Sequence, residues 1–368
     1  MRIAVNTQLL IKDRLEGIGW FSYETLKRIT RAHPEHEFYF IFDRAWHQSF
    51  IFSDNVIPLK TSLPSRHPLL WLARFHHTIP AILRRIGADL FYSPDGWSVI
   101  KPDIPVLLAL HDLNFIHHPG NLPRMTSWYF RTYFPTYARE ARRLITVSEF
   151  SRQDIARSFK IDPKQIDVAY NGVSDVFKPV SQERIRHIRQ KYSQGEKYFI
   201  FVGALNPRKN LSALLRAFDA FCDRSNDRTR LMVIGAPMFS ERFHKLKDYL
   251  PRHADRIDFM GRLDHGELAA LVAAAHALVL PSTFEGFGIP IIEAMQCDVP
   301  VITSNVTSMP EVAGDAALLA DPYSVESIAE ALILLDQNQE LHASLIDKGR
   351  IRRQAFSWDK TAETIYQS

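Results

Sequence analysis

Two nearby glutamates, Glu285 and Glu293, are the sharpest chemical feature of the sequence. They flank a glycine-containing stretch that follows a predicted strand and leads into a helix predicted over residues 289–295. Gly286 and Gly288 would let the backbone approach a ligand closely before that helix begins. Carboxylates at this place suit the vicinal hydroxyls of a ribose or a hexose. The simpler alternative makes Glu285 a charge that favours a helix N-terminus and Glu293 an ordinary surface residue.

A pair of cations, Arg208 and Lys209, follows another predicted strand, Tyr198–Val202. That strand ends at Gly203, and the polar turn after it presents both cations at the start of the next predicted helix. Two cations beside the free N–H groups of a helix form an anion site that matches a diphosphate. A solvated turn with two surface cations is the alternative. It is less attractive because this loop and the glutamate loop both follow strands of one predicted sheet.

Three strand ends in the first half of the chain carry weaker candidates. Gly17 and Gly19 lie between the first predicted strand and its helix, although a lone Gly-x-Gly pair could equally be a tight turn. His111 follows the predicted strand at 106–110 and could donate a hydrogen bond to a sugar hydroxyl, although a lone histidine is more often structural. Ser148 is a candidate helix N-cap that could equally touch a ligand.

Strand-like and helix-like stretches alternate along the chain in two consecutive series. The first series has strands predicted at 3–5, 37–42, 89–92, 106–110 and 144–147, with helices at 18–31, 69–86, 124–142 and 149–159. The second has strands predicted at 198–202, 230–234, 257–260, 278–280 and 299–302, with helices at 211–221, 241–250, 265–275 and 289–295. Alternation of this kind predicts parallel sheets covered by helices on both faces.

We therefore expect an α/β protein with two doubly wound, Rossmann-like domains, residues 1–172 and 173–356. A C-terminal helix over about 357–368 is expected to pack back on the first domain. In open parallel sheets ligands bind beyond the carboxyl ends of the strands. Two such domains facing each other would form a cleft lined by the strand-end loops described above.

Length and composition support this organisation and exclude several classes of protein. The 368 residues are 46% hydrophobic and 23% charged, which fits two globular domains and excludes a disordered, collagenous or coiled-coil chain. The two cysteines, Cys222 and Cys297, are far apart, which argues against a disulfide framework or a cysteine zinc site and favours a reducing compartment. No signal-peptide pattern or membrane-spanning run is apparent, so we expect a cytoplasmic protein.

The positive charge is concentrated in the first domain. Residues 1–172 carry 22 Lys and Arg against 16 Asp and Glu, whereas the remainder carries 23 against 25. Two acid-free windows, 55–88 and 113–139, mix basic and aromatic residues, and the first contains Arg74, Arg84 and Arg85. This mixture suits an anionic membrane surface or an anionic acceptor. The alternative is a solvated basic face beside aromatic core residues, and the modest excess of charge disfavours nucleic acid.

Taken together, these segments resemble family 4 (GT4) retaining glycosyltransferases of the GT-B fold. The resemblance is carried by the two glutamates and by the segments 146–151, 208–210, 261–263, 299–304 and 310–314. It runs from Asn6 to about Pro322, which is nearly the whole chain. Residues 111–113 with His118 and Pro119 are similar to mannosyltransferases that build bacterial O-antigen and related polysaccharides. One departure is Glu16, which stands ahead of Gly17 where many relatives have an additional glycine.

The resemblance implies roles for individual residues of the second domain. Arg208 and Lys209 would neutralise the diphosphate of a nucleotide sugar, and Glu293 would hold its ribose. Glu285 would hold the hexose hydroxyls. The remaining donor-binding residues implied there are Gly203, Arg262, Leu263, Gly286, Phe287, Gly288 and Ile289, with the backbone near 262–263 meeting the base.

The resemblance also implies roles for the first domain. His111 would contact the transferred sugar near its reacting carbon, and Gly17 and Gly19 would line the phosphate side. Ser148 would belong to the same donor-binding set. The first domain would also face the acceptor, with its basic and aromatic windows docking a lipid-linked acceptor at the inner membrane face.

A metal-independent hexosyltransferase is the function implied, with no cofactor and with mannose from GDP-mannose as the preferred donor. The absence of an Asp-x-Asp triplet agrees with metal independence. The acceptor would be lipid-linked or an oligosaccharide used in cell-surface polysaccharide synthesis. The alternatives are a UDP-sugar transferase for glucose, N-acetylglucosamine or galactose, a nucleotide-sugar epimerase or hydrolase of the same architecture, and a non-catalytic nucleotide-sugar sensor.

Overall fold

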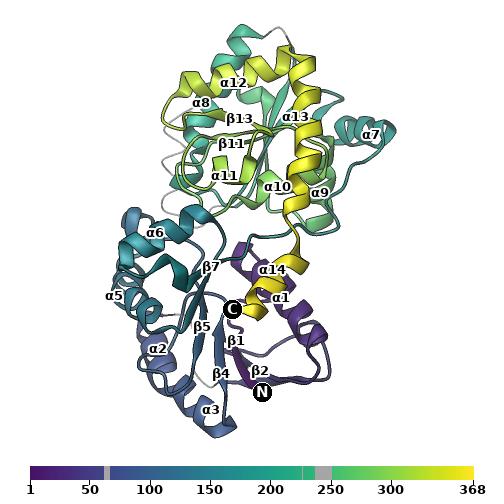
Figure 1. Cartoon of the computed structure of the whole chain (residues 1–368). Helices are drawn as coiled ribbons and strands as arrows, with labels where there is room; N and C mark the ends of the chain where they lie inside the picture. Colours follow the sequence, from purple (N-terminus) through teal and green to yellow (C-terminus); the bar gives the residue numbers. More distant parts are fainter. Residues whose placement is uncertain (62–66, 226, 237–250) are drawn as a thin grey trace. The chain divides into compact units, whose positions relative to one another are not determined.

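The computed structural model describes residues 1–61, 67–225, 227–236 and 251–368. This part of the chain forms two compact units, residues 1–171 with 357–368 and residues 172–356 (Figure 1). The predicted division at residue 172 differs from the observed one by a single residue. The helix predicted at 241–250 lies outside the described residues.

The first unit is built on a parallel sheet with the strand order β3-β2-β1-β4-β5-β6-β7. Its strands are β1 (Arg2–Asn6), β2 (Glu37–Phe42), β3 (Val56–Lys60), β4 (Leu90–Ser93), β5 (Val106–Ala109), β6 (Arg143–Thr146) and β7 (Ile166–Val168). The strand order reverses between β1 and β4, which pair in parallel. The carboxyl ends of these two strands therefore form the topological switch point, where open α/β sheets bind ligands.

Helices follow most of these strands, as parallel crossovers require. The helices of the first unit are α1 (Gly17–Ala32), α2 (Pro68–Ala73), α3 (Ile79–Ile86), α4 (Asn114–His117), α5 (Arg124–Glu140), α6 (Glu149–Phe159) and α14 (Trp358–Gln367). Short helical turns lie at η1 (Gln48–Phe50), η2 (Arg74–Thr78), η3 (Pro119–Asn121) and η4 (Pro163–Gln165).

The last helix, α14, packs on α1 and so completes the first unit (Figure 1). Trp358 and Ile365 are buried, and the Trp358 ring meets Phe21 edge-on at 6.4 Å between centroids. The hydroxyl of Thr361 donates to the backbone carbonyl of Tyr170, next to the end of the first segment of this unit. The C-terminal helix is therefore part of the first unit's core.

The second unit repeats the same architecture with a parallel sheet of order β10-β9-β8-β11-β12-β13. Its strands are β8 (Tyr198–Val202), β9 (Arg230–Ile234), β10 (Ile257–Gly261), β11 (Ala277–Leu280), β12 (Val301–Ser304) and β13 (Ala317–Ala320). The order reverses between β8 and β11, which pair in parallel. The loops that follow these two strands therefore lie side by side at the carboxyl edge.

Seven described helices surround this second sheet. They are α7 (Gln182–Ser193), α8 (Leu211–Arg224), α9 (His265–Ala274), α10 (Ile289–Gln296), α11 (Met309–Ala313), α12 (Val325–Gln337) and α13 (Gln339–Arg352). Short turns lie at η5 (Pro207–Lys209), η7 (Ala254–Arg256) and η8 (Arg353–Ala355). Every residue of β8, β11 and β12 is buried, which explains why these strands read as continuous apolar runs.

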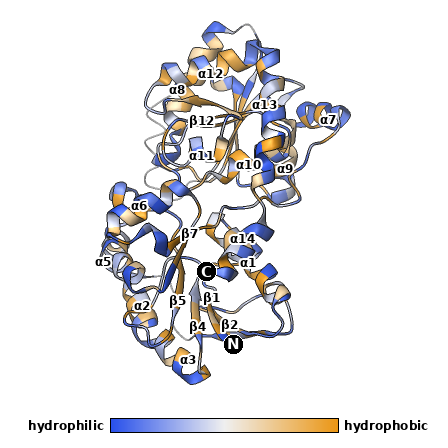
Figure 2. Ribbon diagram, in the orientation of Figure 1, coloured by the Kyte–Doolittle hydropathy of each residue, from blue (hydrophilic) through white to orange (hydrophobic). Residues whose placement is uncertain are grey.

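Hydropathy follows the layers of each unit. In Figure 2 the strand β5 is coloured orange, whereas the surface helix α7 is largely blue. The hydrophobic core of the second unit includes Phe199 and Phe201 from β8 and Leu214 and Phe218 from α8. Removing such side chains from water is the main favourable contribution to each fold. No helix in the described ranges is long and apolar enough to cross a membrane.

Three strands, the helices α12 and α13 and one helix break differ from the sequence-based prediction, which placed no helix over residues 325–352. The edge strands β3, β7 and β13 were not predicted, and they lack a continuous buried pattern. The single helix predicted over residues 69–86 is instead α2 and α3 joined by a π-helical turn, η2. Pro80, near the start of α3, has no N–H to donate, which disfavours an uninterrupted α-helical ladder.

The predicted basic and aromatic windows are corrected by the structure. Arg74 is completely buried, so it cannot contact a membrane. Its guanidinium donates to the carbonyl of Ile41 at 3.2 Å and to Thr61. Tyr129 and Tyr137 of α5 are also core residues, joined by a 2.8 Å hydrogen bond between their hydroxyls. Much of this aromatic set thus serves the core, which was the alternative interpretation.

Several side chains of the same windows do lie at the surface. Arg84 and Arg85 at the end of α3 are exposed. On α5, Arg124 and Arg131 are exposed, and Trp128 is 47% exposed. These residues, without Arg74, belong to the predicted basic and aromatic surface and remain accessible.

Candidate functional site

The two loops singled out in the second half of the sequence are held together at the switch point. The loop after β8 carries Arg208 and Lys209, and the loop after β11 carries Glu285. The backbone N–H of Thr283 donates to the carbonyl of Arg208 at 2.7 Å. The side chain of Asn210 donates to the carbonyl of Pro281 at 3.0 Å. The spacing of the strands brings the loops close, and these hydrogen bonds fix their register.

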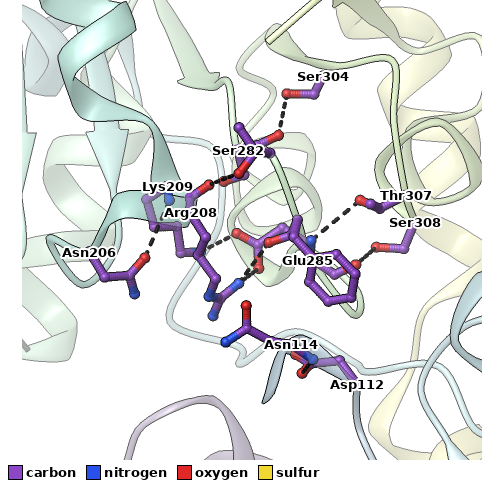
Figure 3. Close-up of polar contacts among 12 residues, drawn as sticks. Asp112, Asn114, Asn206, Arg208, Lys209, Ser282, Glu285, Ser304, Thr307 and Ser308 are labelled. Atoms are coloured by element: carbon purple, nitrogen blue, oxygen red, sulfur yellow. Dashed lines mark hydrogen bonds and ion pairs between the residues drawn. The ribbon is translucent and has the colours of Figure 1, made fainter. Parts of the chain in front are cut away.

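Glu285 forms ion pairs with both cations, a cluster that we call the charge triad (Arg208, Lys209 and Glu285; Figure 3). Nη1 of Arg208 lies 2.6 Å from Oε2 of Glu285, and Nζ of Lys209 lies 2.6 Å from Oε1. Arg208 also donates to the carbonyl of Phe284 at 2.9 Å. The triad carries two positive charges and one negative charge, so it retains a net positive charge that suits an anionic ligand.

The charge triad also determines the ionisation of its carboxylate. Glu285 is 5% exposed, and burial by itself would raise its pKa. The neighbouring charges of Arg208 and Lys209 outweigh burial and lower the pKa of Glu285 to about 2. Glu285 is therefore ionised at every physiological pH, and the triad is a permanent charge arrangement.

Lys209 reaches Glu285 through space that a glycine leaves free. A Cβ atom added at Gly203 would lie 3.1 Å from Cε of Lys209. Gly235, at the end of β9, has a φ of 147°, and a Cβ there would lie 1.9 Å from the carbonyl oxygen of Gly203. Larger residues at these two positions would displace the lysine or the backbone beneath it. This role of Gly203 differs from direct donor contact, which remains a prediction.

Glu293 lies on α10 in an environment opposite to that of Glu285. Among the described residues, its carboxylate makes no hydrogen bond and no ion pair, although Lys209 is close enough to act on its charge. Glu293 is partly exposed, yet desolvation raises its pKa to about 8, and the attraction of Lys209 offsets this effect only in part. A carboxyl group in this state, with no hydrogen bond to the described protein, is suited to hydroxyl groups of a ligand.

The residues between the two glutamates form the entry to α10. Gly288 is the N-cap of this helix with φ of 97°, and a Cβ there would lie 3.0 Å from Cδ1 of Ile291. Phe287 is 4% exposed and its ring meets Phe356 edge-on at 5.6 Å. Gly286 is buried and Ile289, the first residue of α10, is partly exposed. The glycine requirement at residue 288 is thus a backbone requirement.

The predicted base-contact residues follow β10 at the same edge of the sheet. Arg262 is exposed and Leu263 is partly exposed, directly after Gly261. The backbone N–H of Gly235 donates to the carbonyl of Gly261 at 2.8 Å, which ties this loop to the end of β9. The position is compatible with ligand contact, and the role itself stays a prediction.

In the first unit, His111 is found after β5 as predicted, but its hydrogen bonding corrects one expectation. Its Nε2 atom lies 2.8 Å from the carbonyl oxygen of Pro94. A carbonyl only accepts, so Nε2 carries the proton and donates to it. Burial lowers the pKa of His111, so the ring is neutral and Nδ1 is an acceptor. His111 would therefore accept a hydrogen bond from a sugar hydroxyl rather than donate one.

The other first-unit candidates have clear local roles. Ser148 is fully buried and is the N-cap of α6, where its hydroxyl accepts from the backbone N–H of Ser151 at 3.0 Å. Gly17 and Gly19 lie in the first turn of α1 rather than before it. A Cβ at Gly19 would lie 3.2 Å from the carbonyl oxygen of Leu9, so the glycine permits close packing of the preceding loop.

Some residues that shape the charge triad escaped sequence analysis. Asn206 accepts a hydrogen bond from the backbone N–H of Lys209 at 3.3 Å. Thr307 and Ser308, in the loop after β12, bond to the backbone of Glu285. The available signal was their place after a strand adjacent to β11, but hydroxyl residues are common in loops and do not reveal their partners.

Comparisons with known proteins agree with this arrangement of sheets and loops. A family model described as Glycosyltransferase Family 4 matches residues 16–176, and one described as Glycosyl transferases group 1 matches residues 182–352. O-antigen chain mannosyltransferase B of Escherichia coli is 30% identical over 372 residues, covering 96% of each chain. O-antigen chain mannosyltransferase RfbU of Salmonella typhimurium is 29% identical over 282 residues, covering 75% of this chain and 74% of that protein.

Solved structures give the same fold. The Anabaena protein HepE, solved in complex with UDP and glucose, superposes with a TM-score of 0.76 at 18% identity and covers 99% of this chain and 98% of its own. WaaG, a glycosyltransferase involved in lipopolysaccharide biosynthesis, gives a TM-score of 0.76 at 17% identity, with coverage of 98% and 97%.

Two parallel α/β sheets of this topology, with these structural neighbours, define the GT-B fold. The chain belongs to glycosyltransferase family 4. It is a hexosyltransferase, and its similar relatives include mannosyltransferases named for O-antigen chains.

Proposed function

We propose that this enzyme transfers mannose from GDP-mannose to a lipid-linked or oligosaccharide acceptor in cell-surface polysaccharide synthesis, with retention of configuration and without a metal. The observation that carries the proposal is the charge triad at the switch point of the second unit. Its net positive charge matches a diphosphate. The mannosyltransferase relatives, one of them similar over almost the full chain, support the choice of sugar.

The step that we propose needs no protein nucleophile. The acceptor hydroxyl attacks the anomeric carbon from the face of the leaving group, and the bond between that carbon and the diphosphate oxygen breaks. The electron pair of the broken bond goes to the diphosphate, and the acceptor proton passes to a departing phosphate oxygen. Arg208 and Lys209 stabilise the charge that accumulates on the diphosphate, an electrostatic contribution that fixed cations make efficiently.

The remaining residues bind and orient the donor in this proposal. Glu293, with its unused hydrogen-bonding capacity, holds the ribose, and Glu285 holds hexose hydroxyls while it remains paired with the cations. His111 accepts a hydrogen bond from a sugar hydroxyl through Nδ1. The further donor-binding residues are Gly17, Gly19, Ser148, Gly203, Arg262, Leu263 and the stretch 286–289.

A thermal-shift series tests the donor and the metal together. In the presence of EDTA, GDP and GDP-mannose are expected to raise the melting temperature more than UDP, ADP or their sugar derivatives. A ligand at 100 times its dissociation constant adds about 2.7 kcal/mol of stability. Arg208→Ala and Glu293→Ala should remove the response. Arg224→Ala is the matched control, since Arg224 lies exposed on α8 in an ion pair with Glu326.

The outcomes of this series separate the parts of the proposal. A selective response to UDP would replace GDP-mannose with a UDP-sugar such as UDP-glucose, the alternative suggested by the UDP and glucose bound to HepE. A response that disappears with EDTA would contradict metal independence. Donor turnover without any acceptor would point instead to an epimerase or hydrolase of the same architecture.

We also propose peripheral attachment to the inner face of the cell membrane, with the enzyme in the cytoplasm. The accessible basic residues of α3 and α5, together with Trp128, support this contact. The double variant Arg84→Glu, Arg85→Glu should reduce sedimentation with anionic vesicles but not with neutral ones. Arg350→Glu, on α13 of the second unit, is the control. Unchanged binding to anionic vesicles would remove this region as the contact.

A further inference from the structure

Four hydroxyl side chains on β12 and the loop after it hold the backbone of the loop that carries Glu285. Thr303 donates to the carbonyl of Leu280 at 3.0 Å, and Ser304 donates to the carbonyl of Ser282 at 2.7 Å. These two bonds fix the start of the loop. Further along, Thr307 and Ser308 make the contacts to Glu285 itself (Figure 3).

Glu285 is held on both sides of its α-carbon. The hydroxyl oxygen of Thr307 accepts from the backbone N–H of Glu285 at 3.3 Å, and the hydroxyl of Ser308 donates to the backbone carbonyl of Glu285 at 2.9 Å. Two consecutive residues thus satisfy the donor and the acceptor of one buried backbone unit. This arrangement restricts rotation about both backbone dihedrals of Glu285.

The hydroxyl of Ser308 is diverted from the role that its position would favour. Ser308 is the N-cap of α11, a place where a serine side chain normally accepts a hydrogen bond from a helix N–H. No such capping bond is present at Ser308, whose backbone already lies in the helical region, and its hydroxyl donates to Glu285. The Ser308 hydroxyl therefore fixes the glutamate loop and does not cap α11.

Thr307 adopts a backbone conformation that its side chain disfavours. Its φ is 59°, in the left-handed region. Among the non-glycine residues with positive φ in the described ranges, Thr307 is the one with a β-branched side chain. A β-branched residue in this region is a genuine outlier, and such strain gathers at functional sites. The bond from Glu285 to the threonine hydroxyl offers a reason for keeping a threonine where glycine would fit without strain.

We propose that Thr307 and Ser308 are positioning residues that hold Glu285 between Arg208 and Lys209, so that both cations are set at the spacing the diphosphate requires. The inference rests on the proposed role of the charge triad in diphosphate binding, and it is independent of which base or sugar the donor carries. It assigns to a third loop, the one after β12, a part in the transfer reaction.

The geometry explains why the backbone of Glu285 would matter so much. Its two carboxylate oxygens each face a different cation at 2.6 Å. A small rotation of the Glu285 backbone would separate at least one oxygen from its cation and change the spacing of the two cations. Small displacements of groups that position a substrate can reduce the rate of catalysis strongly. The low pKa of Glu285 depends on the same two contacts.

The test compares variants that remove the strain, the hydroxyl or neither. Thr307→Gly removes both the strain and the hydroxyl, Ser308→Ala removes only the donor to Glu285, and Thr307→Ser keeps the hydroxyl. Gln194→Gly is the matched control, since Gln194 has φ of 58° at the exposed C-cap of α7. Melting temperature, kcat, KM and the pH profile of kcat are measured for each, with the donor that the wild-type enzyme turns over.

We expect Thr307→Gly to melt at the wild-type temperature or higher, yet to lose about tenfold or more in kcat. The acidic limb of the pH profile of kcat should move to higher pH in Thr307→Gly, because a carboxylate that is less closely paired has a higher pKa. Ser308→Ala should shift kcat and the acidic limb in the same direction. Thr307→Ser should retain activity, and Gln194→Gly should leave kcat and the pH profile unchanged.

The proposal would be overturned if folded Thr307→Gly and Ser308→Ala had the same kcat and the same pH profile as the wild-type enzyme. A loss of activity that follows a lower melting temperature and is regained on cooling would also overturn it, because it would indicate a purely structural role. If the wild-type enzyme turns over no donor, the proposed function fails first. Calorimetric titration with GDP and UDP then tests the positioning role by itself: weaker binding in Thr307→Gly than in Gln194→Gly supports it, and equal binding overturns it.

Discussion

Cations lie near the carboxyl edges of both sheets, but they have different roles in the two units. In the second unit Arg208 and Lys209 pair directly with Glu285, and the side chain of Arg208 is 21% exposed. In the first unit Arg74 also lies near the carboxyl ends of its strands, but it is 0% exposed. It donates to Ile41 and Thr61, which are neutral acceptors. One edge keeps Arg208 partly accessible to a ligand beside the buried Lys209, and the other uses a buried cation to join strands.

The ionisation of the two edges shows the same contrast. Burial lowers the pKa of Arg74 to about 10, and the attraction of Asp43 and Asp95 offsets this only in part. Asp95 is buried as well, and desolvation raises its pKa to about 6 despite hydrogen bonds from Ser93 and Asn6. Among the described residues Arg74 and Asp95 form no ion pair, whereas Glu285 pairs with two cations and is held fully ionised. Direct pairing of opposite charges, rather than residue type, separates the candidate ligand site from the structural cluster.

Removing the buried arginine is the most drastic way to test this comparison. Arg74→Leu should lower the free energy of unfolding by about 2–5 kcal/mol, because the hydroxyl of Thr61 and the carbonyl of Ile41 are left buried without their donor, at about 1–3 kcal/mol each. Urea denaturation measures the loss. Arg85→Leu, at an exposed position, should change stability by less than about 0.5 kcal/mol. Nucleotide binding by the folded fraction of Arg74→Leu should be normal, and a selective loss of binding would contradict a structural role.

The converse substitution in the second unit should act on the reaction. Lys209→Ala is expected to reduce kcat by about 10²–10³-fold, since it removes one fixed charge from the departing diphosphate. Arg208 still pairs with Glu285, so stability should fall less than in Arg74→Leu. Steady-state kinetics and urea denaturation on the same preparations provide the comparison. Lys348→Ala, which removes an exposed lysine near Asp315, is the control. An equal kcat in Lys209→Ala and in Lys348→Ala would contradict a role for Lys209 in the reaction.

The two glutamates of the second unit sharpen the comparison within one site. The pKa of Glu293 is raised to about 8 from an ordinary value of 4.5, so between these pH values the folded protein holds a proton that the unfolded chain has released. Stability from this group therefore falls as pH rises through that window. Glu293→Gln should raise the free energy of unfolding at pH 7.5 by about 1–3 kcal/mol.

The same Glu293→Gln variant should bind nucleotide more weakly, so stability and affinity should move in opposite directions. Thermal unfolding at pH 5 and pH 7.5, with and without nucleotide, measures both. At pH 5 the difference in stability from wild type should be much smaller, because the wild-type carboxyl group is protonated in the folded state and partly protonated in the unfolded state. A destabilised Glu293→Gln at pH 7.5 would contradict the raised pKa.

Much of the fold could be predicted because the central strands are buried on both faces. β8 and β11 contain only buried residues, so their apolar runs stand out between polar loops. The edge strands β3 and β13 escaped prediction for a physical reason. An edge strand is covered less completely, and β13 consists of alanine and leucine, which favour helices. Pro58 in β3 also weakens a strand signal.

The candidate site was predictable to the level of loops but not of contacts. Placement after adjacent strands was enough to expect Arg208, Lys209 and Glu285 near one another. Direct pairing of one carboxylate with both cations depends on side-chain reach, including the space left at Gly203, which no sequence spacing reveals. The opposite pKa shifts of Glu285 and Glu293 depend on three-dimensional burial and charge, so they could not be read from the motif that contains both.

The return of α14 to the first unit has a consequence for how the protein is made. Residues 172–356 form the whole second unit and are inserted between two parts of the first. During synthesis the ribosome completes the second unit while the first still lacks the helix that buries Trp358 and Ile365 against its core. The first unit therefore begins before the second and is completed after it, and its exposed apolar face must stay unaggregated until α14 has been synthesised.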